Sequence, residues 1–291
     1  MASAFACPAC GYGQHASNAK CVKCGVQLNE AETPDAEVAS TPSLSREAWR
    51  ALGIGFVLAL ILMKLPFMGM LFNPLITIVH ELGHTVAGWL FGFPSIPAFD
   101  FGEGGGFTQP LDSEQDWLGA AIMYVIFAVL LWRTRRRRPV TVFVLLLIPL
   151  YSYIFFTHWH QAVILAAGHA AEIIMASVFL ERAMSGTTLL QADERPAYAM
   201  IGFLILFHDV SFFWQMGHDA SFRDWYDVGK SYADNDLVVL LREHVRSSLP
   251  NLANYFLVGC GGAVLAAWIA FRNEDRLAAM ARDFLPAKEE D

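Results

Sequence analysis

A histidine, a glutamate and a second histidine at fixed spacing form the clearest chemical signal in the sequence. Residues 80–84 read His-Glu-Leu-Gly-His, an HExxH motif. On a helix, His80 and His84 lie one turn apart on one face and could bind the same zinc ion, while Glu81 could reach a water on that ion. Zinc lowers the pKa of such a water to about 7, and a carboxylate can take its proton and pass it to a leaving amine. The motif therefore predicts a zinc site with Glu81 as its general base.

The motif lies in an apolar stretch, residues 74–93, that is long enough to cross a membrane. Burying a charged group in a bilayer costs about 2.5–3.5 kcal/mol on insertion scales, so ionisable residues in such stretches are usually functional. We therefore interpret the three residues as an active site. A structural polar cluster or a decayed site is the alternative interpretation.

The motif supplies two zinc ligands, and the third must come from elsewhere in the chain. Two later apolar stretches hold candidates, His169 with Glu172 and His208 with Asp209. We expect Glu172 to be the ligand, because it shares a helix face with His169 and glutamate is a common third ligand of HExxH zinc. Alternatively, His169 is the ligand with Glu172 as its hydrogen-bond acceptor, or His169 donates to the oxyanion of the reaction intermediate. His208 and Asp209 are expected to line the same cavity, or else to form an interhelical hydrogen bond.

Four of the five cysteines form two short CxxC knuckles near the N-terminus. Cys7 and Cys10 make the first knuckle, and Cys21 and Cys24 make the second. Two such knuckles can complete a tetrahedral site of four thiolates, and two disulfides are the alternative. The segment has too few apolar residues for a core, so its folding energy would come largely from a structural zinc ion. It resembles zinc-ribbon modules, which implies a structural or protein-binding role.

Composition places these sites in a membrane protein. Charged residues make up 16% of the 291 residues, below the quarter that is typical of soluble domains, and the shortfall is concentrated in long apolar stretches. The apolar content excludes disorder, and no nucleic acid is expected as a partner because the dense basic cluster at 133–138 lies between two apolar stretches. We predict an all-α polytopic membrane protein with about six to seven transmembrane helices and a small N-terminal zinc ribbon. The expected spans are 51–72, 74–93, 117–132, 139–157, 161–181, 197–215 and 252–271.

Four parts follow from these segments. Residues 1–28 are expected to form the ribbon, 29–48 a flexible linker that tethers the ribbon without packing, 49–272 the multi-span membrane domain with the metal site, and 273–291 a cytoplasmic tail. Seven simple spans with arginines on the cytoplasmic side would put the N-terminus outside, but a thiolate zinc site favours a reducing compartment. We therefore expect a multi-pass protein of the cell membrane with a cytoplasmic ribbon.

One segment between residues 51 and 115 must then fail to cross the membrane simply. Lysine, proline and asparagine-proline positions within these stretches are the expected breaks. They are Lys64, Pro66 and Asn73-Pro74.

Around the HExxH motif the sequence resembles the site-2 protease family of intramembrane zinc metalloproteases. The match runs from Val79 through the motif to Ala87 and on to Phe91-Gly92. The glycine-rich residues 94–110 look like the family's membrane-dipping hairpin, which would hold substrate as an added strand. A flexible exposed loop is the alternative for this segment. The resemblance covers about residues 70 to 110, and the Asn-Pro-Asp-Gly-like segment that supplies the family's third ligand has no counterpart in the sequence.

The resemblance implies a zinc metalloendopeptidase of regulated intramembrane proteolysis, with one catalytic and one structural zinc ion. Its partners would be the lipid bilayer, a membrane-spanning protein substrate and a protein that binds the ribbon. A catalytically inactive scaffold or regulator of the same fold, recruiting partners through the ribbon, is the alternative function. A transporter that uses the intramembrane histidines and acids as a metal or proton path is a third hypothesis.

Overall fold

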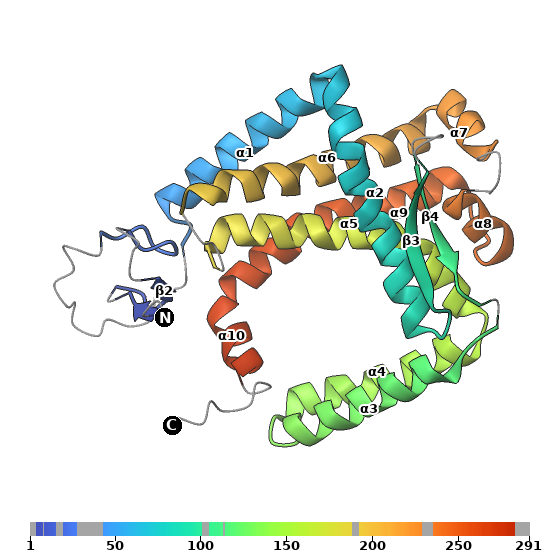
Figure 1. Cartoon of the computed structure of the whole chain (residues 1–291), viewed down its shortest axis with the longest axis horizontal. Helices are drawn as coiled ribbons and strands as arrows, with labels where there is room; N and C mark the ends of the chain where they lie inside the picture. Colours follow the sequence, from blue (N-terminus) through green and yellow to red (C-terminus); the bar gives the residue numbers. More distant parts are fainter. Residues whose placement is uncertain are drawn as a thin grey trace. The chain divides into compact units, whose positions relative to one another are not determined.

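The computed structural model describes residues 4–7, 9–15, 20–27, 43–100, 105–112, 114–187, 192–228 and 235–282. Helices dominate this part of the chain (Figure 1). The chain divides into two compact units. The first unit comprises Met1–Gly69, Ile173–His208 and Gly259–Ala279, and the second comprises Met70–Glu172, Asp209–Val258 and Met280–Asp291.

In the part of the chain that the structure describes, five helices are long and apolar enough to cross a membrane, which supports the prediction of a membrane protein. Each overlaps one of the last five spans expected from the sequence. They are α3 (Trp117–Thr134), α4 (Arg138–Phe156), α5 (Trp159–Ser185), α6 (Arg195–His218) and α9 (Leu249–Arg272).

The first two expected spans, 51–72 and 74–93, have other bounds in the structure. Helix α1 (Arg46–Lys64) begins before the first span, and α2 (Pro66–Leu90) begins within it. The break falls at Leu65, between the predicted breakpoints Lys64 and Pro66. Pro74, the other predicted break, lies inside α2. Helix α1 opens with charged residues, and α2 contains the HExxH motif.

Local sequence signals fix several helix ends. The side chain of Ser45 accepts a hydrogen bond from the Ala48 amide at the start of α1, and Asp116 does the same for Leu118 at the start of α3. Helix α5 ends before Gly186, whose φ of +70° is the left-handed conformation that glycine adopts most readily. The five spanning helices are apolar on most faces, as expected for helices that contact lipid as well as protein.

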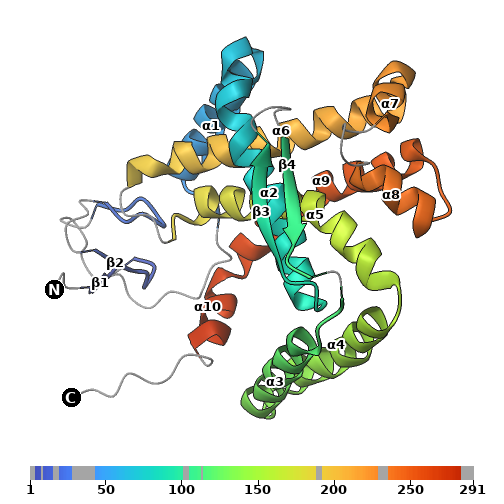
Figure 2. The ribbon, with the colours of Figure 1, turned by 45° about the vertical axis from the view of Figure 1, so that its right-hand side comes forward.

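The second unit contains a helical hairpin and a β-hairpin. Helices α3 and α4 pack through an aromatic core that includes Phe127, Tyr151 and Phe155, and the Tyr151 hydroxyl donates to the carbonyl of Leu90 at the end of α2 (2.7 Å). Strands β3 (Ser95–Asp100) and β4 (Gly105–Pro110) pair in antiparallel register, with Ser95 opposite Pro110. The strands run beside α2 (Figures 1 and 2). The hairpin expected over 94–110 is therefore present as two paired strands.

Two short helices, α7 (Ala220–Asp227) and α8 (Asp236–Glu243), connect α6 to α9 within the second unit. Asp219 caps α7 by accepting hydrogen bonds from the amides of Ser221 and Phe222. Asn235, the residue before α8, donates from its side chain to the Tyr226 carbonyl of α7 (2.6 Å). This bond ties the start of α8 to the end of α7.

The first unit contains the N-terminal cysteine segment, defined as residues 4–7, 9–15 and 20–27. Its strands β1 (Ala4–Ala6) and β2 (Gly13–His15) are antiparallel. Lys23 lies 2.9 Å from a carboxylate oxygen of Asp275 and 3.5 Å from one of Glu274, both in α10 (Glu274–Arg282). A side chain at Gly25 would collide with Glu47 at the start of α1.

These contacts correct the expectation of a ribbon that is tethered without packing, because an ion pair and close backbone approach hold the cysteine segment against α1 and α10. Helix α1 begins at Arg46, so the expected linker would end by residue 45. Most of that linker, residues 29–42, lies outside the described residues. The predicted tail begins with α10.

Candidate metal centre

The two histidines of the HExxH motif lie one turn apart on α2, as their spacing predicts. Their Nε2 atoms are 3.0 Å apart. The helix is held against α5 at this level, because Gly83 leaves no room for a side chain against Ala167 and Ala171 of α5. His84 and Glu81 are both buried. The motif therefore faces the interior of the second unit.

Asp236 completes the group, and the sequence analysis did not select it. Its Oδ2 atom is 3.2 Å from the Nε2 of His80 and 3.2 Å from the Nε2 of His84. Asp236 is the first residue of α8, whose residues Leu237 and Leu240 are buried and anchor the helix. Burial alone would raise the pKa of Asp236, but its hydrogen bonds to the two histidines outweigh burial and hold the pKa below its ordinary value. A charged carboxylate is the form that binds metal.

The three donor atoms form a triangle with edges of 3.0, 3.2 and 3.2 Å. A tetrahedral zinc ion bound at 2.0–2.1 Å separates its nitrogen and oxygen donors by about 3.3–3.4 Å. The triangle is therefore close to one face of such a tetrahedron. Its fourth corner would remain open for water or substrate, as in catalytic rather than structural zinc sites.

The Nδ1 atom of each histidine has its own partner, which leaves Nε2 available to bind a metal. Nδ1 of His84 donates to the Ile164 carbonyl (2.7 Å), and Nδ1 of His80 faces a carboxylate oxygen of Glu172 (3.3 Å). With a proton on Nδ1, each Nε2 carries the lone pair that a metal requires. Partners of this kind orient the histidine ligands of metal sites.

Gly168 of α5 leaves space open beside the same nitrogen atoms. A Cβ atom at this position would lie 2.5 Å from both Nε2 atoms. Any larger residue would therefore displace the two imidazoles. The absence of a side chain at 168 and the donor triangle are two independent features that fit a metal ion at His80, His84 and Asp236.

The expected third ligand, Glu172, takes a different place. Its Oε1 faces the Nδ1 side of His80, and its Oε2 lies 2.8 Å from Nδ1 of His169. His80, His169 and Glu172 also have ligand atoms within 4.8 Å of one another. His80 can present only one lone pair at a time, however, and its Nε2 already converges with His84 and Asp236. Asp236 therefore lies beside the Nε2 atoms of both histidines, whereas Glu172 faces Nδ1 of His80. The role of Glu172 as a ligand stays a prediction.

His208 and Asp209, the other predicted pair, belong to different units. Asp209 in α6 is buried and belongs to the second unit with the metal centre, whereas His208 belongs to the first. Their expected role as residues that line the cavity stays a prediction.

The predicted general base, Glu81, contacts the β-hairpin. The Thr108 hydroxyl of β4 lies 2.7 Å from Oε2 of Glu81 and 3.1 Å from its backbone carbonyl. Gly106 of the same strand lies so close that a Cβ there would be 2.7 Å from Cγ of Glu81. Strand β4 therefore runs directly beside the carboxylate.

The four N-terminal cysteines form a second group of potential metal ligands. The Sγ atoms of Cys7 and Cys24 are 3.7 Å apart, and those of Cys10 and Cys21 are 3.6 Å apart. These distances are far from a disulfide bond of about 2.05 Å and close to the separation of about 3.8 Å between thiolates on one zinc ion. All four are free cysteines, which opposes the disulfide alternative.

Each cysteine knuckle closes in the same way. The amides of Gly11 and Gly25 donate to the carbonyls of Cys7 and Cys21, and both glycines have a positive φ, +69° and +76°. Such a turn requires a residue that tolerates the left-handed conformation. The glycine after each CxxC pair thus shapes the turn that brings its two thiols together.

No protein-family model, curated protein or solved structure matches the chain.

Proposed function

We propose that the protein is an intramembrane zinc metalloendopeptidase, similar to site-2 proteases, that cleaves membrane-spanning protein substrates. The observation that carries this proposal is the convergence of His80, His84 and Asp236 on one point beside Glu81, in a chain with five helices that could cross a membrane. Two histidines and a carboxylate with an open fourth position are typical of hydrolytic zinc sites. Asp236 supplies the acidic ligand that the sequence comparison with the family lacked.

Each residue has a distinct task in peptide hydrolysis. The two histidines and Asp236 hold the metal, which when bound would polarise the scissile carbonyl and lower the pKa of water to about 7. Glu81 takes the proton of the attacking water and returns it to the leaving amine. The Thr108 hydroxyl, 2.7 Å from Glu81, fixes the carboxylate for that transfer. Glu172 orients His80 through its Nδ1 atom.

The β-hairpin supports an extended substrate. Within the described residues, β3 and β4 form a two-stranded sheet, so each strand has an outer edge that no third strand covers. A substrate strand added to β4 would lie beside Glu81, because Thr108 and Gly106 of that strand contact this residue. A transmembrane substrate must unwind to present a peptide bond there.

The arginines favour an orientation with the cysteine segment in the cytoplasm. Residues 133–138 join α3 to α4, and α5 and α9 end with Arg182 and Arg272 in their last turns. With five alternating spans, the positive-inside rule puts all three of these points in the cytoplasm. The cysteine segment contacts α10, which directly follows α9, so it lies on the same side. This arrangement lets α1 cross and requires α2 to begin and end on the outer side.

The decisive experiment replaces Glu81 by glutamine in purified protein reconstituted in vesicles with a panel of membrane-spanning peptides. We expect cleavage, measured by mass spectrometry of the fragments, to fall by about 10²–10⁴-fold while the bound metal is retained. The exposed Glu114, which lies between β4 and α3, provides the matched control as Glu114→Gln. Equal cleavage by the Glu81 variant and the wild type would refute the proposal, and metal binding without cleavage by either would favour the inactive scaffold.

A further inference from the structure

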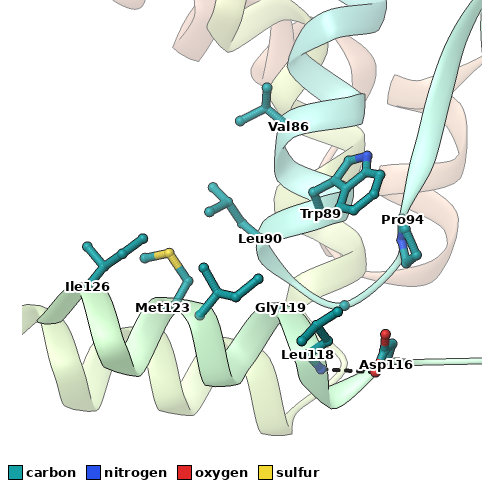
Figure 3. Close-up of a pocket in the computed structure, with 11 residues that line it drawn as sticks. Val86, Trp89, Leu90, Pro94, Asp116, Leu118, Gly119, Met123 and Ile126 are labelled. Carbon is teal, nitrogen blue, oxygen red and sulfur yellow. Dashed lines mark hydrogen bonds between the residues drawn. The ribbon is translucent and has the colours of Figure 1, made fainter. Parts of the chain in front are cut away.

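An apolar hollow of about 290 Å³ lies between the end of α2 and the start of α3, on a different side of α2 from the metal centre. Figure 3 shows side chains of both helices facing this space. Helix α2 contributes Val86, Trp89 and Leu90, which are turned away from the HExxH histidines by the helical repeat. No residue of the hollow takes part in the proposed hydrolysis.

The floor of the hollow follows one face of α3. It contains Leu118, Ile122 and Ile126, which are spaced four residues apart and therefore lie in a row along the helix. Eight residues of helix correspond to about 12 Å. This length is close to the hydrocarbon depth of one leaflet, which is about 15 Å for a core of about 30 Å.

The hollow has a polar end and an apolar end. Among the residues that line it, all of them described, only Asp116 is charged, and it caps the first turn of α3. The neighbouring Trp117 is exposed, as tryptophans at the headgroup level are. The opposite end of α3 carries the arginine cluster. The hollow therefore starts at the membrane surface away from the arginines and runs toward the bilayer centre.

The walls of the hollow are preformed. The indole nitrogen of Trp89 donates to the Ser95 carbonyl of β3 (2.8 Å), which fixes the ring as a wall. Gly119 brings α3 so close to α2 that a Cβ there would lie 2.5 Å from the Trp89 carbonyl. These contacts hold the two helices at a fixed separation on one side of the hollow.

The lining of the hollow and its opening to the side select its occupant. The hollow offers a long, narrow, apolar surface with almost no hydrogen-bonding groups, which suits an unbranched hydrocarbon chain. Val86, Leu118 and Ile122 are each more than half exposed, so the hollow is open along its side to the surrounding lipid.

We propose that this hollow binds a single acyl chain of a membrane phospholipid, in the leaflet at the Asp116 end of α3. The headgroup lies at the level of Asp116 and Trp117, and the chain passes Leu118 and Ile122 to reach Ile126. The proposal rests on the membrane location of the protein and is independent of its catalytic activity.

The test uses the full chain reconstituted in vesicles of phosphatidylcholine that carries a photoreactive diazirine midway along one acyl chain. After irradiation, cross-linked residues are mapped by mass spectrometry. We expect cross-links at 86–94 and 118–126 to exceed those on the outward face of α4, at Val142, Phe143 and Leu146, by at least about tenfold, a preference of about 1.4 kcal/mol. Cross-links spread evenly over all exposed apolar faces would mean ordinary lipid contact and would overturn the proposal.

A pair of matched variants distinguishes the hollow from its surroundings. Ile122→Trp fills the hollow and should abolish the excess cross-linking, whereas Val125→Trp, at an exposed position of the same helix outside the hollow, should leave it unchanged. Equal cross-linking in both variants would overturn the proposal. A photoreactive benzoylphenylalanine in place of Leu118 should gain the mass of a phospholipid, and a cross-link to a second protein chain instead would assign the hollow to a protein partner.

Discussion

Two of the groups of potential metal ligands among the described residues are built in opposite ways. The four cysteines come from one short stretch, with Cys7 and Cys24 separated by 17 positions, and two glycine turns bring them together. The centre at His80 and His84 needs Asp236, which is 156 positions away from His80 and lies on a separate short helix. Local backbone geometry builds the first group, and the packing of several helices builds the second.

This difference determines what a metal ion does in each place. The cysteine segment has little core of its own, so a metal ion bound there would supply most of its folding energy. The centre at His80, His84 and Asp236 is held by α2, α5 and α8, which are positioned by their own buried residues. Its metal would therefore support chemistry more than folding. We therefore expect loss of metal from the cysteine segment to affect folding most, and loss of metal from the other centre to affect chemistry most.

The largest effect is expected from breaking the cysteine group. Cys24→Ser removes one thiolate ligand, and structural zinc sites of this kind bind with about 10–16 kcal/mol. We expect the cysteine segment to unfold, measured as rapid trypsin cleavage at Lys20 and Lys23, while the helical circular dichroism of the membrane region is unchanged. Cys260→Ser in α9 is the control. A segment that resists trypsin in the Cys24 variant would contradict a metal-dependent fold.

The next effect concerns the space beside the histidines. Gly168→Ala places a Cβ atom 2.5 Å from two Nε2 atoms and must displace them. We expect cleavage of a membrane-spanning peptide to fall by about 10²-fold, since misplacement by about 1 Å has this cost in active sites. Gly261→Ala is matched to it, because Gly261 is also helical and has open space where its Cβ would be. Equal activity of the two variants would show that the space is not needed.

A smaller effect separates a ligand from a residue that orients a ligand. Glu172→Gln should weaken metal binding at His80, His84 and Asp236 by about 10–100-fold. This is the usual cost of losing the hydrogen-bond partner that orients a histidine ligand. Glu181→Gln, on the same helix, serves as the control. Metal affinity is measured by competition with a chelator in protein whose cysteine group has been removed. Complete loss of metal would instead make Glu172 the third ligand.

The smallest effect tests the docking of the cysteine segment. Lys23→Ala removes the ion pairs to Asp275 and Glu274, and pairs near the surface contribute about 0.2–1 kcal/mol. We expect a modest rise in trypsin cleavage at Lys20, with cysteine-bound metal retained. Lys64→Ala, at the far end of α1, is the control. An effect as large as that of Cys24→Ser would mean that docking, rather than metal, folds the segment.

Sequence spacing was sufficient wherever the residues of a feature are close along the chain. The CxxC knuckles predicted the cysteine cluster, and HExxH predicted the paired imidazoles. The resemblance at residues 94–110 implied the β-hairpin, with a flexible loop as the alternative. Apolar stretches predicted seven spans, and among the described residues the last five of these coincide with helices that could cross a membrane. The break between α1 and α2 at Leu65 lies between Lys64 and Pro66, two of the predicted breakpoints.

The place of Asp236 beside the two histidines could not be found in this way. Asp236 lies among several acidic residues of a polar connection, and only the fold shows that it meets His80. Glu172 was more prominent because a lone acid in an apolar stretch needs a partner, and it does have one, on the opposite side of the same imidazole. Gly168 and Thr108 were missed for a similar reason, because nothing local marks a glycine or a threonine that faces a motif on another element.

The most direct test of the metal centre counts zinc in the purified full chain. Cys10→Ser and Cys24→Ser together remove two ligands of the cysteine group, and this variant should retain about one zinc ion per chain. Adding Asp236→Ala should remove that ion, whereas adding Asp227→Ala, at the exposed end of α7, should not. Zinc that persists after Asp236→Ala, or no zinc in the cysteine variant, would contradict a centre formed by His80, His84 and Asp236.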